Sequence, residues 1–337
     1  MYDSHILIWL PSPMGDTVMC SPVLKALRQH YADAKITFCC NSTAQGVLTP
    51  CKWTDNWIIQ GNFFKTVQEF RANKFTHALL FKNSFGSALA CFLGHIPQRI
   101  GYARDARTFL LTKKLNAPVE SNGKFKPIPA VDYYNAIAKK IGCINTDTLP
   151  TLEVDQQHKT EIKELFPDLS KSGPVIIMVP GAAFGLNKCW PPEYFAQTAE
   201  KLIQQYKAQI ILSVSPNSQE KAIAREIVKQ CKYQLINLGE TPLNLGQLKA
   251  LFLRADLVIT NDTGPRHIAI ALKRKLITLF GPNDPAWTQT GYTQEIQITA
   301  QGPCVPCQRP TCKRPDIACM HTISVNTVYK AAARLLC

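Results

Sequence analysis

The architecture of this chain can be worked out from one segment, Leu257-Val-Ile-Thr-Asn-Asp-Thr-Gly-Pro-Arg-His-Ile-Ala-Ile-Ala-Leu272. Its first residues are apolar and β-branched, which is typical of a buried strand in a parallel sheet. The chain then turns through Asn261 to Gly264 into a helical pattern with Pro265 in its first turn. Such a turn directs unpaired backbone N–H groups and the positive end of the helix dipole at one point. We therefore predict an anion site, suited to a phosphate, at the end of this strand.

Three side chains of this segment bear on that site. Asp262 and Thr263 are residue types that cap helices, and His267 would lie about one helical turn inside, facing the same point. Two interpretations follow from the spacing. The segment is either an ordinary capped helix with a partly buried histidine, or a phosphate site that uses these side chains.

Apolar strand patterns and helical patterns alternate along most of the 337 residues, in two halves. The second half resumes after a polar stretch, at Lys171-Ser-Gly-Pro. This alternation predicts an α/β protein with two doubly wound parallel sheets, whose ligands bind beyond the carboxyl ends of the strands. We expect one domain at residues 1–170 and another at residues 171–322.

The composition limits the partners. The chain has 38 lysines and arginines against 24 acidic residues, a net charge of +14, which favours an anionic partner. No recognition helix, zinc finger or RNA-binding signature occurs, so a phosphorylated sugar or an acidic membrane surface is favoured over nucleic acid. The first ten residues lack a secretion-signal pattern, and no apolar run approaches the ~20 residues that span a bilayer. We therefore expect a cytoplasmic protein in which the thirteen cysteines are mostly reduced thiols.

Two further turns contain residues that suit chemistry. Gly15 and Asp16 follow the first strand pattern, and Asp16 either caps the next helix or takes a proton from an attacking hydroxyl. Gly181 and Lys188 belong to a turn in the second half, where Lys188 is either a surface lysine or part of a diphosphate site. Neither turn has the G-x-G-x-x-G or G-x-x-x-x-G-K-[ST] pattern of dinucleotide or P-loop sites. Because Lys188 and the Asp262 turn end equivalent strands of one half, we expect them to converge on one ligand.

Five segments together resemble the successive motifs of glycosyltransferase family 9, the ADP-heptose:lipopolysaccharide heptosyltransferases, and are most similar to the heptosyltransferase II branch. They are Gly15-Asp-Thr with Pro22, Asn83-Ser-Phe-Gly-Ser-Ala-Leu, Ile96-Pro-Gln-Arg-Ile-Gly-Tyr, Pro180-Gly-Ala-Ala-Phe-Gly-Leu-Asn-Lys-Cys-Trp-Pro and Asn261-Asp-Thr-Gly-Pro-Arg-His-Ile-Ala. The resemblance implies a GT-B fold, with an acceptor domain followed by an ADP-sugar domain and a cleft between them. It also implies inversion at the anomeric carbon without a catalytic metal. The chain contains no D-x-D pattern, which agrees with that implication.

The resemblance also implies roles for residues of this chain. Asp16 becomes the general base, and Lys188 neutralises the ADP leaving group. The donor is held by Gly181, Lys188, Asp262, Thr263, Gly264 and His267. The anionic sugar-lipid acceptor is met by Gly15, Asn83, Arg99, Arg104 and Arg107, although an exposed basic loop explains each arginine equally well.

Two positions depart from the family pattern. Cys189 stands where a second basic or polar residue is usual, and the segment Ser215-Pro-Asn-Ser-Gln lacks the acidic residue expected to hold the donor ribose. Both departures concern the identity of the nucleotide-sugar rather than the class of reaction.

A cysteine run near the end needs a separate interpretation. Cys304, Cys307, Cys312 and Cys319 could close a tetrahedral structural zinc site, although only one C-x-x-C is present. Free thiols or a local disulfide are the alternatives. The remaining residues, 323–337, predict a last helix, which in a GT-B fold would pack back on the first domain.

The resemblance thus implies an inverting transferase that moves heptose from ADP-L-glycero-D-manno-heptose to the inner core of lipopolysaccharide. It would act at the cytoplasmic face of the inner membrane as a peripheral protein. Two alternatives stay open at this point. One is a GT-B enzyme that transfers or epimerises another nucleotide-sugar, and the other is a non-catalytic protein that binds sugar nucleotides.

Overall fold

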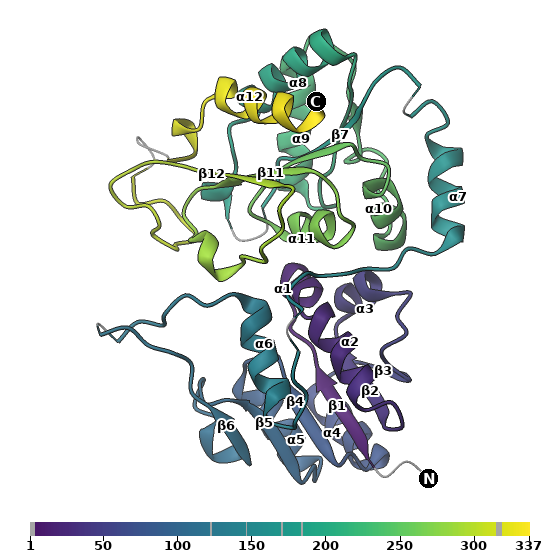
Figure 1. Ribbon diagram of the computed structural model, residues 1–337, viewed down its shortest axis with the longest axis vertical. Helices are drawn as coiled ribbons and strands as arrows, with labels where there is room; N and C mark the ends of the chain where they lie inside the picture. The colour runs from purple at the N-terminus through teal and green to yellow at the C-terminus, as the bar shows by residue number, and fades with distance from the viewer. Residues whose placement is uncertain (1–3, 122, 146, 170, 183–184, 315–318) are drawn as a thin grey trace. The chain divides into compact units, whose positions relative to one another are not determined.

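The computed structural model describes residues 4–121, 123–145, 147–169, 171–182, 185–314 and 319–337. The chain forms two compact units, each built around its own parallel sheet (Figure 1). The first unit comprises Met1–Glu153 with Ala286–Gly291, and the second comprises Val154–Pro285 with Tyr292–Cys337. None of the helices in the described ranges has both the length and the hydropathy needed to span a bilayer.

The first unit has a six-stranded sheet in the order β3-β2-β1-β4-β5-β6. Its strands are β1 His5–Trp9, β2 Lys35–Cys40, β3 Asn56–Ile59, β4 His77–Leu80, β5 Gln98–Tyr102 and β6 Lys113–Leu115. Its helices are α1 Met14–Met19, α2 Ser21–His30, α3 Ser42–Leu48, α4 Phe63–Asn73, α5 Phe85–Leu93 and α6 Ala130–Lys139, with the short 3₁₀ turn η1 Thr108–Leu110. The sequence predicts one helix over residues 18–31. The structure instead starts α1 earlier and begins a second helix at Ser21, with Pro22 in its first turn.

The second unit repeats this arrangement, in the order β12-β11-β10-β7-β8-β9. Its strands are β7 Val175–Val179, β8 Gln209–Leu212, β9 Ile236–Asn237, β10 Leu257–Asn261, β11 Leu276–Phe280 and β12 Glu295–Thr299. Its helices are α7 Gln156–Leu165, α8 Pro192–Tyr206, α9 Ser218–Gln230, α10 Leu245–Phe252, α11 Gly264–Ala271 and α12 Val325–Leu336. The 3₁₀ turns are η2 Leu186–Lys188, η3 Pro285–Trp287 and η5 Cys319–Thr322.

In both sheets the strand order reverses beside the unit's first strand, which pairs in parallel with the second and the fourth strand of the same unit. These are the Rossmann-type switch points, where ligands bind outside the carboxyl ends of the strands. Asp16 follows β1 and Asn83 follows β4, whereas Lys188 follows β7 and Asp262 follows β10. The topology therefore brings residues that are far apart in sequence to equivalent ends of strands.

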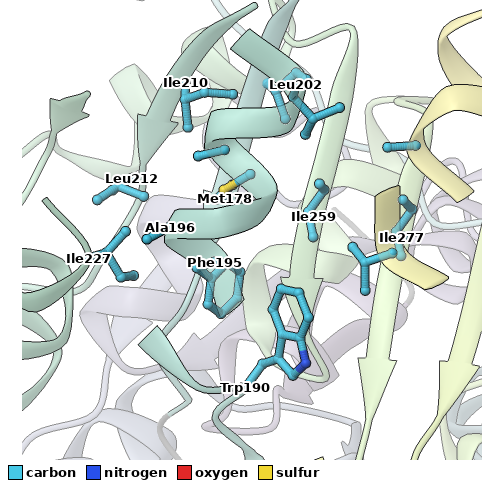
Figure 2. Packing of buried hydrophobic residues seen from close by; sticks show 14 of the residues in the cluster. Met178, Trp190, Phe195, Ala196, Leu202, Ile210, Leu212, Ile227, Ile259 and Ile277 are labelled. Carbon is cyan, nitrogen blue, oxygen red and sulfur yellow. The ribbon is translucent and has the colours of Figure 1, made fainter. Parts of the chain in front are cut away.

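The core of the second unit lies between α8 and its sheet (Figure 2). Strand side chains such as Met178 and Ile259 pack there with Phe195 and Leu202 of α8. Trp190 is fully buried in this core, and its indole N–H donates to the carbonyl oxygen of Ile323 at 2.9 Å. The segment before α8 is thereby joined to the segment before α12.

The placement of α12 corrects one prediction. This helix was expected to pack on the first domain, but it packs on α8, β10 and β11 of the second unit. Val328 and Ala332 form its buried stripe and belong to the second unit's core. Shape and apolar periodicity decide the partner, because α8 and the sheet offer a matching apolar surface.

The boundary between the units also differs from residue 170. The structure divides the chain after Glu153, and α7 packs against α10. Arg254 fixes the end of α7 by donating to the carbonyl oxygens of Phe166 and Leu169, at 3.2 and 2.8 Å. Helix α7 is polar and has one buried residue, Ile162. Hydrogen bonds from Arg254 therefore hold its end, and the sequence of α7 alone does not predict them.

Candidate active site

A buried ion pair lies at the switch point of the second unit. The Lys188 ammonium donates to the Asp262 carboxylate at 2.6 Å and to the Asp262 carbonyl oxygen at 2.9 Å. Lys188 is 7% exposed and Asp262 6% exposed. Burial acts to raise the pKa of Asp262, but the charge and hydrogen bond of Lys188 outweigh it, so that the pKa is lowered. The pair therefore holds two opposite charges in place at this end of the sheet.

Neither Asp262 nor Thr263 caps α11. The Asp262 carboxylate accepts from Lys188 and also from the Asn283 amide at 3.0 Å. Thr263 occupies the N-cap position, but its side chain makes no capping hydrogen bond. The interpretation of an ordinary capped helix is therefore wrong. Lys188 is not a surface lysine either, since 93% of its surface is covered.

His267 is fully enclosed in the first turns of α11. Burial, and secondarily the charge of Arg266, lowers the pKa of His267 to about 3. The imidazole is therefore neutral at physiological pH, and its Nδ1 atom has no hydrogen-bond partner in the described structure. A neutral ring contributes no charge beside the Lys188–Asp262 pair.

Arg266 and Glu295 form a second buried ion pair that the sequence interpretation missed. Two N–H groups of Arg266 donate to the two oxygens of Glu295, at 2.6 and 3.0 Å, and Thr278 donates to the same carboxylate at 2.6 Å. Burial favours a higher pKa for Glu295, yet these bonds lower it overall. The available signal was a charge inside each of two apolar runs, because a buried charge needs a partner. The pair ties the start of α11 to β12.

The loop after β7 is joined to β10 and α9. Asn261 donates to the carbonyl oxygen of Pro180 at 2.7 Å and accepts from the Trp190 N–H at 3.2 Å. A Cβ atom on Gly181 would lie 2.2 Å from the Glu220 carboxylate, so a larger residue there would displace the Glu220 side chain. Ala183 and Phe184 of the predicted loop lie outside the described residues.

Glu220 corrects the predicted absence of an acidic residue at the end of β8. It lies in the first turn of α9, just beyond the segment that seemed to lack an acid, and its carboxylate accepts from the Ser215 N–H at 2.8 Å. The carboxylate thus returns to the carboxyl end of the sheet and contacts Gly181. The segment considered, Ser215-Pro-Asn-Ser-Gln, ends one residue before Glu220, whose side chain extends back from α9.

In the first unit, Asp16 follows β1 and is partly exposed. It is the third residue of α1, whose N-cap is Pro13, so the capping interpretation is wrong for Asp16 as well. Thr17 secures the turn by donating to the carbonyl oxygens of Pro11 and Pro13, at 3.0 and 3.1 Å. Burial and then the charge of Asp16 raise the pKa of Tyr134, which lies behind it. Asp16 and Gly15 therefore stand on a fixed turn at the switch point.

Asn83 and Arg107 meet beside β4. Arg107 is fully buried and donates to the Asn83 side-chain oxygen at 2.7 Å, to the Lys82 carbonyl oxygen at 2.7 Å and to the Tyr102 carbonyl oxygen at 3.0 Å. These bonds fix the Asn83 side chain at the end of β4. Arg104 lies in the same turn as Arg107, over the Phe125 ring and 3.7 Å from Asp105.

Arg99 is not brought to this group. It is the second residue of β5, at the amino end of the strand, and its guanidinium donates to the carbonyl oxygens of Leu110 and Ile96, at 2.7 and 2.5 Å. The predicted acceptor set is thus divided by the sheet. Asn83, Arg104 and Arg107 belong to the carboxyl end, and Arg99 belongs to the opposite end.

A comparison with protein families gives a match over residues 63–318 to glycosyltransferase family 9 (heptosyltransferase). The chain belongs to glycosyltransferase family 9. It is therefore a glycosyltransferase, and its residues 63–318 include parts of both units.

Relatives of this family 9 chain agree with the assignment. The chain is 29% identical to lipopolysaccharide heptosyltransferase 2 of Escherichia coli over 301 residues, which cover 84% of each chain. It is also 29% identical to lipooligosaccharide heptosyltransferase 2 of Haemophilus influenzae, over 84% of this chain and 85% of the relative. The solved structure of E. coli ADP-heptose lps heptosyltransferase II matches with a TM-score of 0.81 and 26% identity, over 98% of each chain. A family 9 structure from Veillonella parvula matches with a TM-score of 0.83 and 21% identity, over 100% of this chain and 98% of the other. The predicted GT-B fold is confirmed.

The cysteine run of this family 9 chain packs near the loop that follows β7. The Gln308 N–H donates to the Pro282 carbonyl oxygen at 2.7 Å, and Asn187 donates to the carbonyl oxygen of Arg309. Burial and the neighbouring thiols Cys307, Cys304 and Cys312 raise the pKa of Cys319. All thirteen cysteines are free thiols. The described residues contain no group of three or more His, Cys, Asp or Glu arranged to hold a metal, so the structural zinc stays a prediction.

Proposed function

We propose that this chain is an inverting heptosyltransferase that moves heptose from ADP-L-glycero-D-manno-heptose to the inner core of lipopolysaccharide. The observation that carries the proposal is the buried Lys188–Asp262 pair, which places a fixed cation at the switch point of the second unit. The names of the relatives, lipopolysaccharide and lipooligosaccharide heptosyltransferase 2, support heptose as the sugar and a lipopolysaccharide core as the acceptor.

The second unit would bind the donor. Lys188 and the start of α11, with Thr263 and Gly264, stabilise the negative charge of the diphosphate. Asp262 keeps the Lys188 ammonium in position, and the neutral His267 offers a nitrogen to a hydroxyl of the sugar or ribose. Glu220, which contacts Gly181, supplies a carboxylate that suits the two hydroxyls of the ribose.

The first unit would bind the acceptor and begin the chemistry. Asp16 accepts the proton of the acceptor hydroxyl while that oxygen forms a bond to the anomeric carbon. The bond from that carbon to the diphosphate breaks on the opposite side, so the configuration inverts and ADP leaves. Lys188 and the helix start neutralise the leaving group, and this mechanism needs no metal ion. Gly15, Asn83, Arg104 and Arg107 would position the anionic acceptor, with Arg107 acting through Asn83.

The acceptor also sets the location that we propose. A lipid-linked core is presented by a membrane, so the protein would work in the cytoplasm as a peripheral partner of the inner-membrane surface. Nucleic acid is not among the proposed partners.

For the cysteine run, metal analysis of protein purified without chelators would test a structural zinc. Less than one-tenth of an equivalent of metal would exclude it.

The decisive experiment compares wild-type protein with Asp16→Asn, using ADP-heptose and truncated lipopolysaccharide cores with product mass analysis. We expect wild type to add one heptose, and Asp16→Asn to lose roughly 10²- to 10⁴-fold in rate while it binds ADP-heptose equally well. Retained turnover of the variant would remove Asp16 from the mechanism. A wild type that prefers UDP-sugars would favour the other nucleotide-sugar enzymes, and one that binds ADP-heptose but never transfers it would favour a binding protein.

A further inference from the structure

The exposed phenylalanines of this protein are unevenly distributed. Six phenylalanines are exposed in the described part of the chain, and all of them belong to the first unit. Three lie together on α5 and η1, namely Phe85 at 41% exposure, Phe92 at 49% and Phe109 at 75%. The rings of Phe85 and Phe109 lie 6.2 Å apart, which joins the two segments into one apolar surface.

Helix α5 is apolar on both sides. Its sequence, Phe85-Gly-Ser-Ala-Leu-Ala-Cys-Phe-Leu93, contains no charged residue. Ala88 and Cys91 face the core of the first unit, against β4 and β5, whereas Phe85 and Phe92 are seven residues apart on the outer side. A helix that only covered a sheet would turn polar residues to water. The outer stripe is therefore not explained by the fold of this unit.

Cations surround this stripe. In the sheet register Ala78 pairs with Arg99 and Gly101 pairs with Lys114, so both cations lie on the side of the sheet that α5 covers. Arg99 stacks on the Phe92 ring at 5.4 Å, and Arg71 of α4 donates to the Leu93 carbonyl oxygen at 2.8 Å. Figure 1 shows α4, α5 and β6 in this part of the first unit. We call Phe85, Phe92 and Phe109 with Arg71, Arg99 and Lys114 the α5 face.

Charge points to one kind of partner. Residues 63–126 contain eleven lysines and arginines but only three carboxylates, a net charge of +8 out of +14 for the whole chain. Phenylalanines that project from an uncharged helix suit the acyl boundary of a bilayer, and the surrounding cations suit its anionic headgroups. A nucleic-acid site would instead need a groove with cations interleaved among the rings.

We propose that the α5 face docks the protein on an anionic membrane surface. The proposal rests on the membrane-bound acceptor of the proposed function, and names the surface that reaches it. The face is formed by residues other than Asp16, Asn83 and Arg107, and it borders the acceptor residues, since Phe85 and Phe109 follow Asn83 and Arg107 by two positions. The proposal gives Arg99 a role. This residue lies at the end of β5 away from the acceptor residues, but it contacts Phe92 of the α5 face.

Flotation with vesicles tests this surface. Wild-type protein should float with vesicles of phosphatidylglycerol and phosphatidylethanolamine, and its binding should weaken as the salt concentration is raised. It should stay unbound with vesicles of phosphatidylcholine alone. The double variant Phe92→Ser/Phe109→Ser should lose at least about 10-fold in partitioning, and Lys114→Glu several-fold. The matched control is Val228→Ser/Tyr233→Ser, two positions on the second unit that are each 37% exposed, which should float like wild type.

Three results would overturn the proposal. They are a wild type that does not float, a Phe92→Ser/Phe109→Ser variant that floats normally, and a wild type that binds single-stranded RNA in preference to vesicles. Folding of each variant is checked by its thermal transition. Transfer to a delipidated, water-soluble core is measured in parallel, and the double variant should keep the wild-type rate. A protein that floats but never transfers would refute the proposed function alone, whereas one that transfers but never floats would refute the α5 face alone.

Discussion

In the first unit the carboxylate that follows β1 is partly exposed, whereas in the second unit the charges that follow β7 and β10 are buried against each other. The strand order at the two switch points is the same. The two sites differ in whether their charged side chains are buried and paired. In the function that we propose, a base must reach a substrate hydroxyl and exchange its proton, which the accessible Asp16 can do. In the same proposal, a group that stabilises a leaving diphosphate must only stay fixed, which suits the enclosed and paired Lys188.

Because of this difference, we expect the largest loss of stability from a substitution of Lys188. Lys188→Met should lower the free energy of unfolding by about 3–5 kcal/mol, because Asp262 is left buried without its cation. Lys188→Met combined with Asp262→Asn should recover most of the loss, since no uncompensated charge remains. Urea denaturation followed by circular dichroism measures both. The exposed Lys229→Met is the control, and a loss at Lys229 as large as that at Lys188 would contradict the buried pair.

Arg107, the buried cation of the first unit, should matter less. Its partners are carbonyl and amide oxygens rather than a buried carboxylate, so Arg107→Met leaves no lone charge behind. We expect a loss of about 2–3 kcal/mol. The partly exposed Arg104→Met should cost less than about 1 kcal/mol. The same urea experiment compares the two, and equal losses would mean that burial of Arg107 has no energetic consequence.

His267 should make the second site sensitive to acid. An unfolded histidine takes up a proton below pH 6.5, whereas the buried His267 does so only near pH 3, so stability falls as the pH is lowered between these values. The expected fall between pH 6.5 and 5 is about 2 kcal/mol. His267→Gln should flatten this part of the profile. The lowered pKa values of Asp262 and Glu295 act in a separate window, below about pH 4.5, so they do not mimic it. An unchanged slope in His267→Gln would show that this histidine is not the source.

The smallest effect on stability should come from Asp16. Asp16→Asn changes a partly exposed side chain on a turn held by Thr17, so the free energy of unfolding should stay within about 0.5 kcal/mol of wild type. Thermal denaturation next to the transfer assay measures this directly. A variant that loses both activity and several kcal/mol would mean that Asp16 supports the structure rather than the reaction.

Much of the fold could be predicted, because it depends on local patterns. Apolar β-branched runs mark buried strands, and Pro265 marks the first turn of α11. The α/β class, the two sheets and the turns that contain Asp16, Lys188 and Asp262 follow from such patterns. The packing of α12 could not be predicted in this way, because an amphipathic helix specifies that it needs an apolar surface but not which surface supplies it.

The sequence by itself determined which residues lie at the carboxyl ends of the strands, since a parallel sheet sends every strand-to-helix turn to the same edge. Only the tertiary structure decided the partners. Lys188 meets Asp262 across 74 residues, Arg266 meets Glu295 across 29, and Glu220 reaches back to Gly181. The physical reason is that burial makes a partner obligatory for every charge, while the order of strands in the sheet chooses the partner.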